Sequence, residues 1–167
     1  MGNELRTELY QRLATKLRSM PRRYVAVCGA SEATQDQLDA AREVGKLLAE
    51  SGAIVINGGF GGVMGAASEG ASRAGGTVIG LLPDTDRAGA NPHLTISLPT
   101  GLGQARNVLI VTAAESVIAI GQGWGTLSEI AVARRLGRPV TALDSWSIKG
   151  LETAKTPAEA VRRALGE

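Results

Sequence analysis

The sequence predicts an α/β protein with one doubly wound, mostly parallel sheet and helices on both of its faces. Short runs of Val, Ile and Ala alternate along the chain with segments of helical periodicity, which is the order of elements in a βαβ fold. These runs lack polar alternation, so both faces of each strand are expected to be buried, as in a parallel sheet. The 167 residues, of which 44% are hydrophobic, are enough for one domain.

The first expected element is a helix that precedes the first strand. Leucines recur at every fourth position among charged neighbours, at Leu5, Leu9, Leu13 and Leu17. This spacing predicts an amphipathic helix within residues 1–22. We expect that helix to pack on the domain or on a partner subunit, and residues 23–167 to form a Rossmann-like nucleotide- or phosphate-binding domain.

Strands and helices then alternate to the end of the chain. The expected strands are 23–28, 53–57, 77–82, 94–97, 116–120 and 139–143. The expected helices are 34–51, 63–75, 102–115, 126–137 and a last short helix from Pro157 to Leu165. Ligands of such a sheet bind beyond the carboxyl ends of its strands, so a site is expected in the loops that follow them.

Composition argues against nucleic-acid and membrane partners. Lys and Arg total 18 against 16 acidic residues, and a net charge of +2 provides no field that would attract nucleic acid. Aromatic residues make up 3% of the chain, too few for a base-stacking platform. The single cysteine, Cys28, ends an apolar run and is expected to be a small buried core residue. With no signal peptide and no long apolar span, the chain is expected to be cytoplasmic.

Two glycine-rich turns carry the functional signal. Gly121–Glu129 runs from the strand 116–120 into a helix expected near Thr126, and Asn57–Gly65 repeats the arrangement after another apolar strand. Such turns leave backbone N–H groups free for an anion at a helix N-terminus. If the two strands are parallel, both turns open at one edge of the sheet. The predicted ligand therefore carries phosphate.

Three better-known phosphate motifs are absent. The dinucleotide fingerprint requires Gly-x-Gly-x-x-Gly after the first strand, where this chain has Gly29-Ala30-Ser31-Glu32. No Gly-Lys-Ser or Gly-Lys-Thr is present, which excludes a P-loop. Pyridoxal phosphate needs a lysine Schiff base, and no lysine lies in the glycine turns, so a decarboxylase of that kind is rejected.

Three side chains near these loops have a structural and a functional interpretation. Thr126-x-x-Glu129 matches a capping box, in which Glu129 bonds back to the start of the helix, but Glu129 could equally be a catalytic or ligand-contacting carboxylate. Arg106 is either a solvated surface residue or a phosphate partner beyond the sheet. His93 has no second ligand at metal-binding spacing, so it is interpreted as a loop residue and no metal site is expected.

The segments Asn57–Gly70 and Arg106–Glu129 resemble the Lonely Guy-type family of nucleoside-monophosphate phosphoribohydrolases, the cytokinin-activating type also labelled lysine decarboxylases. The family pattern is Gly-Gly-x-x-Gly-x-Met-Gly, then Glu-Arg-Lys, then Pro-Gly-Gly-x-Gly-Thr-x-x-Glu. The similarity covers most of residues 23–144. The run Thr-Gly-Leu-Gly-x-Ala-Arg-Asn is closer to the bacterial and algal branch that includes molybdenum cofactor carrier proteins.

The resemblance implies roles for five residues. It implies a phosphate site at Gly123, Gly125 and Thr126, and a part for Arg106 and Glu129 in N-glycosidic cleavage.

Three departures from the pattern bear on that cleavage. Ala105-Arg106-Asn107 stands in place of Glu-Arg-Lys, so one carboxylate and one cation are missing beside the arginine. Gly121-Gln122-Gly123 replaces Pro-Gly-Gly, and Phe60 adds an apolar side chain at the other turn. These changes keep the phosphate cradle and remove charged groups around the scissile bond.

The sequence therefore predicts a binding or carrier protein for a phosphorylated heterocycle, with the pterin-based molybdenum cofactor as cargo and no cofactor required for catalysis. The alternative is a nucleoside 5′-monophosphate phosphoribohydrolase acting on AMP-like nucleotides, in which Arg106 and Glu129 are catalytic. A nucleotide sensor is a third class. The resemblance also implies a homodimer or homotetramer. The predicted ligand-binding residues are Ser31, Gly58, Gly59, Gly61, Gly62, Met64, Arg106, Asn107, Gly121, Gln122, Gly123, Trp124, Gly125, Thr126 and Glu129.

Overall fold

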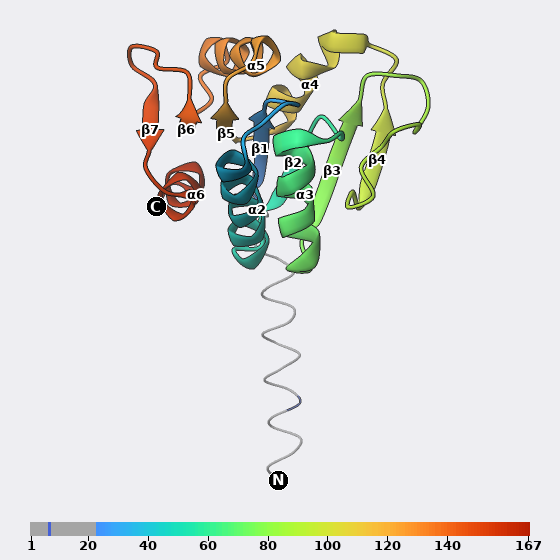
Figure 1. Ribbon diagram of the computed structural model, residues 1–167, viewed down its shortest axis with the longest axis horizontal. Helices are drawn as coiled ribbons and strands as arrows, with labels where there is room; N and C mark the ends of the chain where they lie inside the picture. Colours follow the sequence, from blue (N-terminus) through green and yellow to red (C-terminus); the bar gives the residue numbers. More distant parts are fainter. Residues whose placement is uncertain (1–6, 8–22) are drawn as a thin grey trace.

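The computed structural model describes Thr7 and residues 23–167 (Figure 1). The helix predicted within residues 1–22 therefore lies outside the described part of the chain. The elements are β1 (Tyr24–Gly29), α2 (Gln35–Glu50), β2 (Ile54–Asn57), α3 (Gly62–Arg73), β3 (Thr77–Leu82), β4 (Ile96–Pro99), η1 (Gly103–Ala105), α4 (Arg106–Ala113), β5 (Ser116–Gly121), α5 (Trp124–Arg135), β6 (Val140–Ser145), β7 (Glu152–Ala154) and α6 (Pro157–Leu165).

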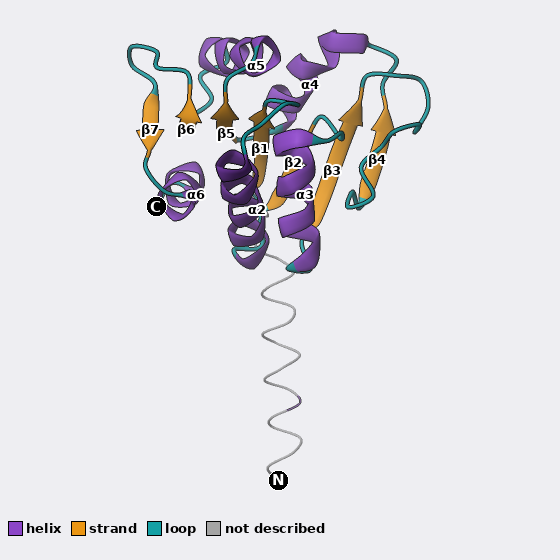
Figure 2. Ribbon diagram, in the orientation of Figure 1, coloured by secondary structure: helices purple, strands orange, loops and turns teal. Residues whose placement is uncertain are grey.

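The strands form a seven-stranded sheet in the order β4-β3-β2-β1-β5-β6-β7 (Figures 1 and 2). Strands β1 to β6 pair in parallel, and the short β7 extends the β6 edge. The chain builds outward from β1 to β4 and then returns to place β5 on the other side of β1. The predicted doubly wound α/β fold is confirmed. The order of the strands reverses between β1 and β5, which is where ligands bind in such folds.

Apolar side chains on both faces of the strands hold the helices against the sheet. Strand β5 is buried along its whole length, which is why its sequence shows no polar alternation. One core cluster joins the sheet to α2, α3 and α6, and the second joins it to α4 and α5. Figure 1 shows α2, α3 and α6 in front of the sheet.

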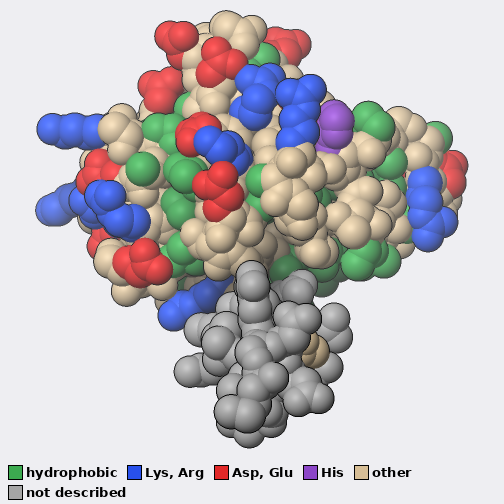
Figure 3. Space-filling model, turned by 90° about the horizontal axis from the view of Figure 1, so that it is seen from below, with side chains coloured by type: hydrophobic (Ala, Val, Ile, Leu, Met, Phe, Trp, Pro, Cys, Tyr) green, Lys and Arg blue, Asp and Glu red, His purple; other side chains and the backbone are tan. Residues whose placement is uncertain are grey.

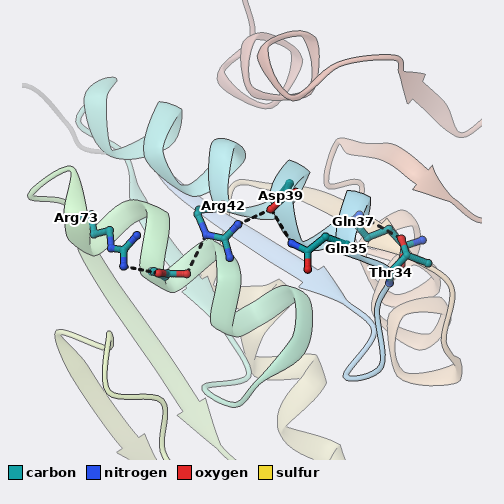
Figure 4. A network of polar contacts seen from close by, with 7 residues as sticks. Thr34, Gln35, Gln37, Asp39, Arg42 and Arg73 are labelled. Carbon is teal, nitrogen blue, oxygen red and sulfur yellow. Dashed lines mark hydrogen bonds and ion pairs between the residues drawn. The ribbon is translucent and has the colours of Figure 1, made fainter.

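Helices α2 and α3 lie unusually close together because two glycines meet the facing backbone. A Cβ atom on Gly45 would strike the Ala67 carbonyl oxygen, and one on Gly70 would strike that of Arg42. Figure 4 shows the polar network over this contact, in which Arg42 lies between Asp39 and Glu69 at 2.6 and 2.9 Å. Of these partly exposed ion pairs only Arg42–Glu69 joins α2 to α3, and such pairs add little to stability.

The sequence misplaced several element boundaries and missed one strand, and the strand expected over 94–97 is shifted by two residues to Ile96–Pro99. The helix expected over 102–115 is a 3-10 turn followed by the shorter α4, and α5 begins two residues before Thr126. Strand β7 was not predicted because it has three residues and two of them, Glu152 and Thr153, are exposed. The last helix matches its prediction, with Thr156 as N-cap and Pro157 in the first turn.

Charged side chains do not gather into a field of one sign on the face seen from the N-terminal ends of the strands. Figure 3 shows basic and acidic side chains interspersed there, in keeping with the net charge of +2. Within the described residues no helix is both long enough and apolar enough to span a membrane.

Candidate functional site

A cavity of about 140 Å³ opens beyond the carboxyl ends of β1, β2 and β5, beside the point where the strand order reverses. Four stretches of the chain, each at a loop or the start of a helix, contribute to its wall. The lining residues are Gly29, Ser31, Phe60, Met64, Gln104, Arg106, Asn107, Gly125, Thr126 and Glu129. Segments up to one hundred residues apart thus meet at one edge of the sheet, as the parallel strand order requires.

The N-terminus of α5 points its free backbone donors at this cavity. The helix begins at Trp124, and its N-cap is Gly123, which has no side chain to satisfy the first N–H groups. The first intrahelical bond of this end runs from the Leu127 N–H to the Gly123 carbonyl, at 2.9 Å. The preceding amides are therefore available to an anion, and the helix dipole favours negative charge there.

The side chain of Thr126 adds a second donor at the same place. Thr126 is buried, and its Oγ1 has no hydrogen-bond partner among the described residues. A buried hydroxyl without a partner is costly, typically by about 1–3 kcal/mol. The hydroxyl lines the cavity, so a ligand there could satisfy it.

Arg106 provides a buried cation in the wall of the same cavity. Its side chain is 6% exposed, which contradicts the interpretation as a solvated surface residue. Nη1 donates to Asn107 Oδ1 at 2.6 Å and Nη2 to the Gly58 carbonyl at 3.4 Å, whereas Nε has no partner in the described chain. Burial lowers the pKa of Arg106 and the charge of Glu129 opposes that effect, but a guanidinium stays protonated in proteins.

Asn107 holds this arginine in place and ties α4 to α5. Its side chain accepts from Arg106 and donates to Ser128 Oγ at 3.4 Å. Asn107 is itself buried. The asparagine that replaces the family's lysine therefore orients Arg106 instead of adding a second cation to the cavity.

Glu129 does not cap α5. Because the N-cap is Gly123, Thr126 is the third residue of the helix and Glu129 lies in its second turn, so the capping-box interpretation is wrong. The carboxyl group is buried and lines the cavity. Burial raises its pKa to about 7, although contacts with the Cys28 thiol and the charge of Arg106 both act to lower that pKa. At neutral pH this carboxyl group is poised between its two protonation states.

Cys28 is the buried core residue that its sequence context predicts. Burial raises the pKa of its thiol well above the usual value, and the nearby charge of Glu129 raises it further. The thiol therefore stays protonated and does not act as a nucleophile. Its contact with Glu129 was not predicted, because nothing in the sequence relates two residues 101 positions apart.

The glycines near the cavity fall into two groups, and packing within the protein explains the first. A Cβ atom on Gly58 would lie 2.6 Å from Arg106 Nη2, and one on Gly59 would lie 2.5 Å from Leu82. Gly62 and Gly121 have positive φ angles of 63° and 73°, which other residues adopt at a cost.

Packing does not explain the second group of glycines. A Cβ atom on Gly61 would meet nothing within 4 Å, and on Gly123 and Gly125 the nearest atoms would be 3.7 and 3.8 Å away. None of the three has a positive φ. The fold would accept a side chain at each of these positions. Because they are glycines, the space at the N-termini of α3 and α5 stays open.

The cavity unites about half of the predicted ligand-binding residues. Those that line it are Ser31, Met64, Arg106, Asn107, Gly125, Thr126 and Glu129. Those that do not are Gly58, Gly59, Gly61, Gly62, Gly121, Gln122, Gly123 and Trp124. Gly29, Phe60 and Gln104 line the cavity and were not predicted to bind, although each stands in or beside a loop that the sequence singled out.

Trp124 extends away from the cavity. It is 81% exposed, and its ring lies 5.9 Å from that of Trp146, tilted by 37°. The Trp146 indole donates to the Gly123 carbonyl at 3.3 Å. The tryptophan pair therefore packs beside the turn that precedes α5 and does not line the cavity.

Comparison with known proteins agrees with the fold and the motifs. An uncharacterized protein from Archaeoglobus fulgidus is 41% identical over 142 residues, 84% of this chain and 93% of that protein. The molybdenum cofactor binding protein from Rippkaea orientalis is 33% identical, with a TM-score of 0.84 over 89% of this chain and 98% of that one. The molybdenum cofactor carrier protein from Chlamydomonas reinhardtii is 30% identical, with a TM-score of 0.80 over 88% and 100%.

A more distant likeness concerns the fold alone. DNA processing protein A from Helicobacter pylori is 20% identical, with a TM-score of 0.68 over 91% of this chain and 84% of that one. The resemblance to the Lonely Guy-type family near its molybdenum cofactor carrier branch is confirmed by the nearer structures. The model of the SLOG cluster4 family matches residues 22–164, and the chain belongs to that family.

Proposed function

We propose that this protein binds and carries a phosphorylated heterocyclic molecule, and that its cargo is the molybdenum cofactor. One observation carries the proposal: Arg106 Nε and Thr126 Oγ1 are buried, lack hydrogen-bond partners among the described residues, and belong to side chains that line one cavity. Together with the open N-terminus of α5 they form a donor-rich, cationic cradle suited to a phosphate group.

The other residues of the cavity suit a flat heterocycle attached to that phosphate. Phe60 offers an aromatic ring and Gln104 an amide, which can contact the face and the edge of a pterin. The likeness to two molybdenum cofactor proteins at 33% and 30% identity supports this choice of cargo. The metal of such a cargo would be bound by the cofactor itself, so the protein needs only to bind the organic part and shield it from solvent.

Ligand retention without turnover tests the carrier function. The full chain is incubated with AMP, a phosphorylated heterocycle that the alternative function, a phosphoribohydrolase, would cleave. Binding of AMP and release of adenine are measured in the same sample. If the protein is a carrier, we expect AMP to bind saturably and phosphate to displace it. Adenine should then be released no faster than in a protein-free control. Adenine release that rises in proportion to protein concentration would contradict it.

A phosphoribohydrolase is the second candidate, and Glu129 favours it. A carboxyl group with a pKa of about 7, in a cavity that also holds a buried arginine, is suited to general acid–base chemistry at neutral pH. In this reaction Glu129 would take a proton from the water that attacks the ribose C1′, the C1′–N bond would break, the base would leave with a proton, and Arg106 would fix the phosphate. If the hydrolase is correct, Glu129→Gln reduces cleavage by roughly a hundredfold or more while the protein stays folded.

A further inference from the structure

The cavity proposed to hold a phosphate group also contains a buried carboxyl group. Thr126 and Arg106 are 2% and 6% exposed, and each has one buried polar atom without a partner among the described residues. Glu129, which is also 6% exposed, lines the same cavity. A carboxylate is a repulsive neighbour for a phosphate, so its protonation state bears on what the cavity can bind.

Glu129 lies one helical turn beyond the hydroxyl group of Thr126. The two residues are three positions apart on α5, so their side chains lie on the same face of the helix, with a rise of about 4.5 Å between them. Both line a cavity of about 140 Å³. A phosphate bonded to Thr126 and to the free amides of α5 would therefore lie close to the Glu129 carboxyl group, among buried groups where water screens charge poorly.

The groups that face the Glu129 carboxyl group come from β1 and α4. Cys28 on β1 contacts it, and burial keeps that thiol protonated and uncharged. Arg106 is the nearby cation and the only ionisable residue of α4. Helix α5 also packs on β5 and β6. Strand β5 has no ionisable residue, and Asp144 of β6 accepts a hydrogen bond from Gln37 of α2 at 2.8 Å.

Arg106 cannot neutralise both Glu129 and a bound phosphate. Its Nη1 and Nη2 donate to the neutral oxygens of Asn107 and Gly58, which leaves Nε for a ligand. The charge of Arg106 opposes the burial that raises the pKa of Glu129 to about 7. A phosphate that pairs with the arginine offsets this charge and adds its own repulsion. Both effects favour the protonated form of Glu129.

We propose that Glu129 takes up a proton from solvent when a phosphate group binds at the N-terminus of α5. This inference rests on the proposed function, because it needs a phosphate in that place, and it adds a rule for binding. The ligand is bound together with a proton, so its affinity is highest below neutral pH and falls as pH rises above 7. Ionisation of Glu129 then favours release of the cargo.

Proton uptake on binding of inorganic sulfate tests the inference directly. Sulfate is a tetrahedral dianion that does not titrate near neutral pH, so any proton taken up enters the protein. The full chain is titrated with sulfate in unbuffered solution that contains an indicator dye. At about pH 7.5 it should take up roughly half a proton or more per chain. At about pH 5.5 uptake should be close to zero, because Glu129 already holds its proton there.

Two glutamine variants identify the group that takes up the proton. Glu129→Gln keeps the size of the side chain but cannot take up a proton, so uptake should disappear. The matched control is Glu50→Gln, at an exposed position of α2, and it should take up as much as the unmodified protein does. Uptake that persists in Glu129→Gln would assign the proton to another group, such as the single histidine, His93, and would overturn the inference.

The pH dependence of sulfate affinity is a second readout that needs no variant. Between about pH 7 and pH 8.5, at constant ionic strength, the Kd of the unmodified protein should rise by roughly tenfold, as expected when one proton binds with each sulfate. Calorimetry measures this change. A constant Kd over this range would overturn the inference and leave the phosphate site intact. Failure to bind sulfate at any pH would overturn the phosphate site itself, and with it both the inference and the proposed function.

Discussion

At the residue scale, the chemistry of the cavity depends on donors that the protein leaves unused. Arg106 is buried, yet its Nε has no partner among the described residues, and the same is true of Thr126 Oγ1. Leaving buried donors unsatisfied destabilises a fold unless a ligand completes them. Both residues belong to motifs that the sequence had singled out, but the sequence could not show that their donors would be unpaired.

The substitution Thr126→Asp should abolish anion binding. It places a carboxylate at the N-terminus of α5, where repulsion of an incoming phosphate at about 4 Å amounts to a few kcal/mol. Affinity for AMP measured by calorimetry should fall by roughly a hundredfold or more. The control Thr126→Val removes the hydroxyl without adding charge and should weaken binding by only about tenfold. Unchanged affinity in the aspartate variant would show that the turn is merely structural.

Glu129→Gln should change how stability depends on pH. Between pH 4.5 and 7 the folded protein holds a proton on Glu129 that the unfolded chain has released, so this group's contribution to stability is lost as pH rises through that window. Glutamine does not ionise, so the variant does not lose this stability as pH rises. At pH 8 it should be more stable than the unmodified protein by at most about 3 kcal/mol.

Thermal unfolding at a series of pH values checks this expectation. Glu50→Gln, at an exposed position on α2, serves as the control for loss of a carboxylate and should leave the pH dependence unaltered. A glutamine variant at position 129 that shows the same pH dependence as the unmodified protein would refute the assignment of a raised pKa to Glu129.

At the scale of the elements, some glycines of the two turns are required by close packing and others leave open space. Sequence alone cannot separate these two groups. Gly58 is a glycine because the Arg106 guanidinium packs against it, whereas Gly125 faces open space. Both appear in the sequence as members of similar turns. Only the arrangement of neighbouring side chains distinguishes a glycine that the packing requires from one that faces open space.

Gly125→Ala should therefore raise stability and lower affinity. Position 125 lies in the first turn of α5, its nearest neighbour to an added Cβ is 3.8 Å away, and alanine favours a helix over glycine by about 0.5–1 kcal/mol. The added methyl group occupies space at the proposed phosphate cradle. Calorimetry should show affinity for AMP reduced by about tenfold or more.

The matched control is Ala131→Gly, at an exposed position of the same helix. It should lower stability by up to about 1 kcal/mol and leave affinity unchanged. If Gly125→Ala binds AMP as well as the unmodified protein does, Gly125 is not part of the cradle.

The elements that the sequence predicted well are those with a strong apolar signal. Strand β3 matches its expected bounds, and β5 differs by one residue, because their runs of buried apolar residues admit no other assignment. The start of α5 was misplaced because Thr126-x-x-Glu129 fits a capping box, whereas the helix uses the glycine at position 123. Strand β7 depends on pairing with β6, which no local pattern reveals.

At the scale of the whole molecule, an oligomer is predicted from the family resemblance. The described domain exposes apolar side chains on more than one element, including Trp124 at 81% and Leu136 at 48%. Light scattering at micromolar concentration should give at least twice the 17.2 kDa mass of one chain. A single species at the mass of one chain would contradict this prediction.

The position of the cavity could be predicted from the whole-molecule pattern, and the contacts among its side chains could not. Parallel strands place the turns after β2 and β5 at one edge, so their proximity follows from fold class. The contact between Cys28 and Glu129, and that between Arg106 and the Gly58 carbonyl, depend on how α4 and α5 pack against the sheet. Such contacts between distant segments are fixed by packing and leave no trace in local sequence.

The central claim is that the cavity at the N-terminus of α5 holds a phosphorylated heterocycle as cargo. Native mass spectrometry of the full chain, after loading with molybdenum cofactor and removal of excess ligand, tests it most directly when the unmodified protein and Thr126→Asp are compared. The unmodified protein should retain one intact ligand per chain, and the aspartate variant should retain none. Equal retention by both proteins, or loss of the ligand from both, would contradict the account.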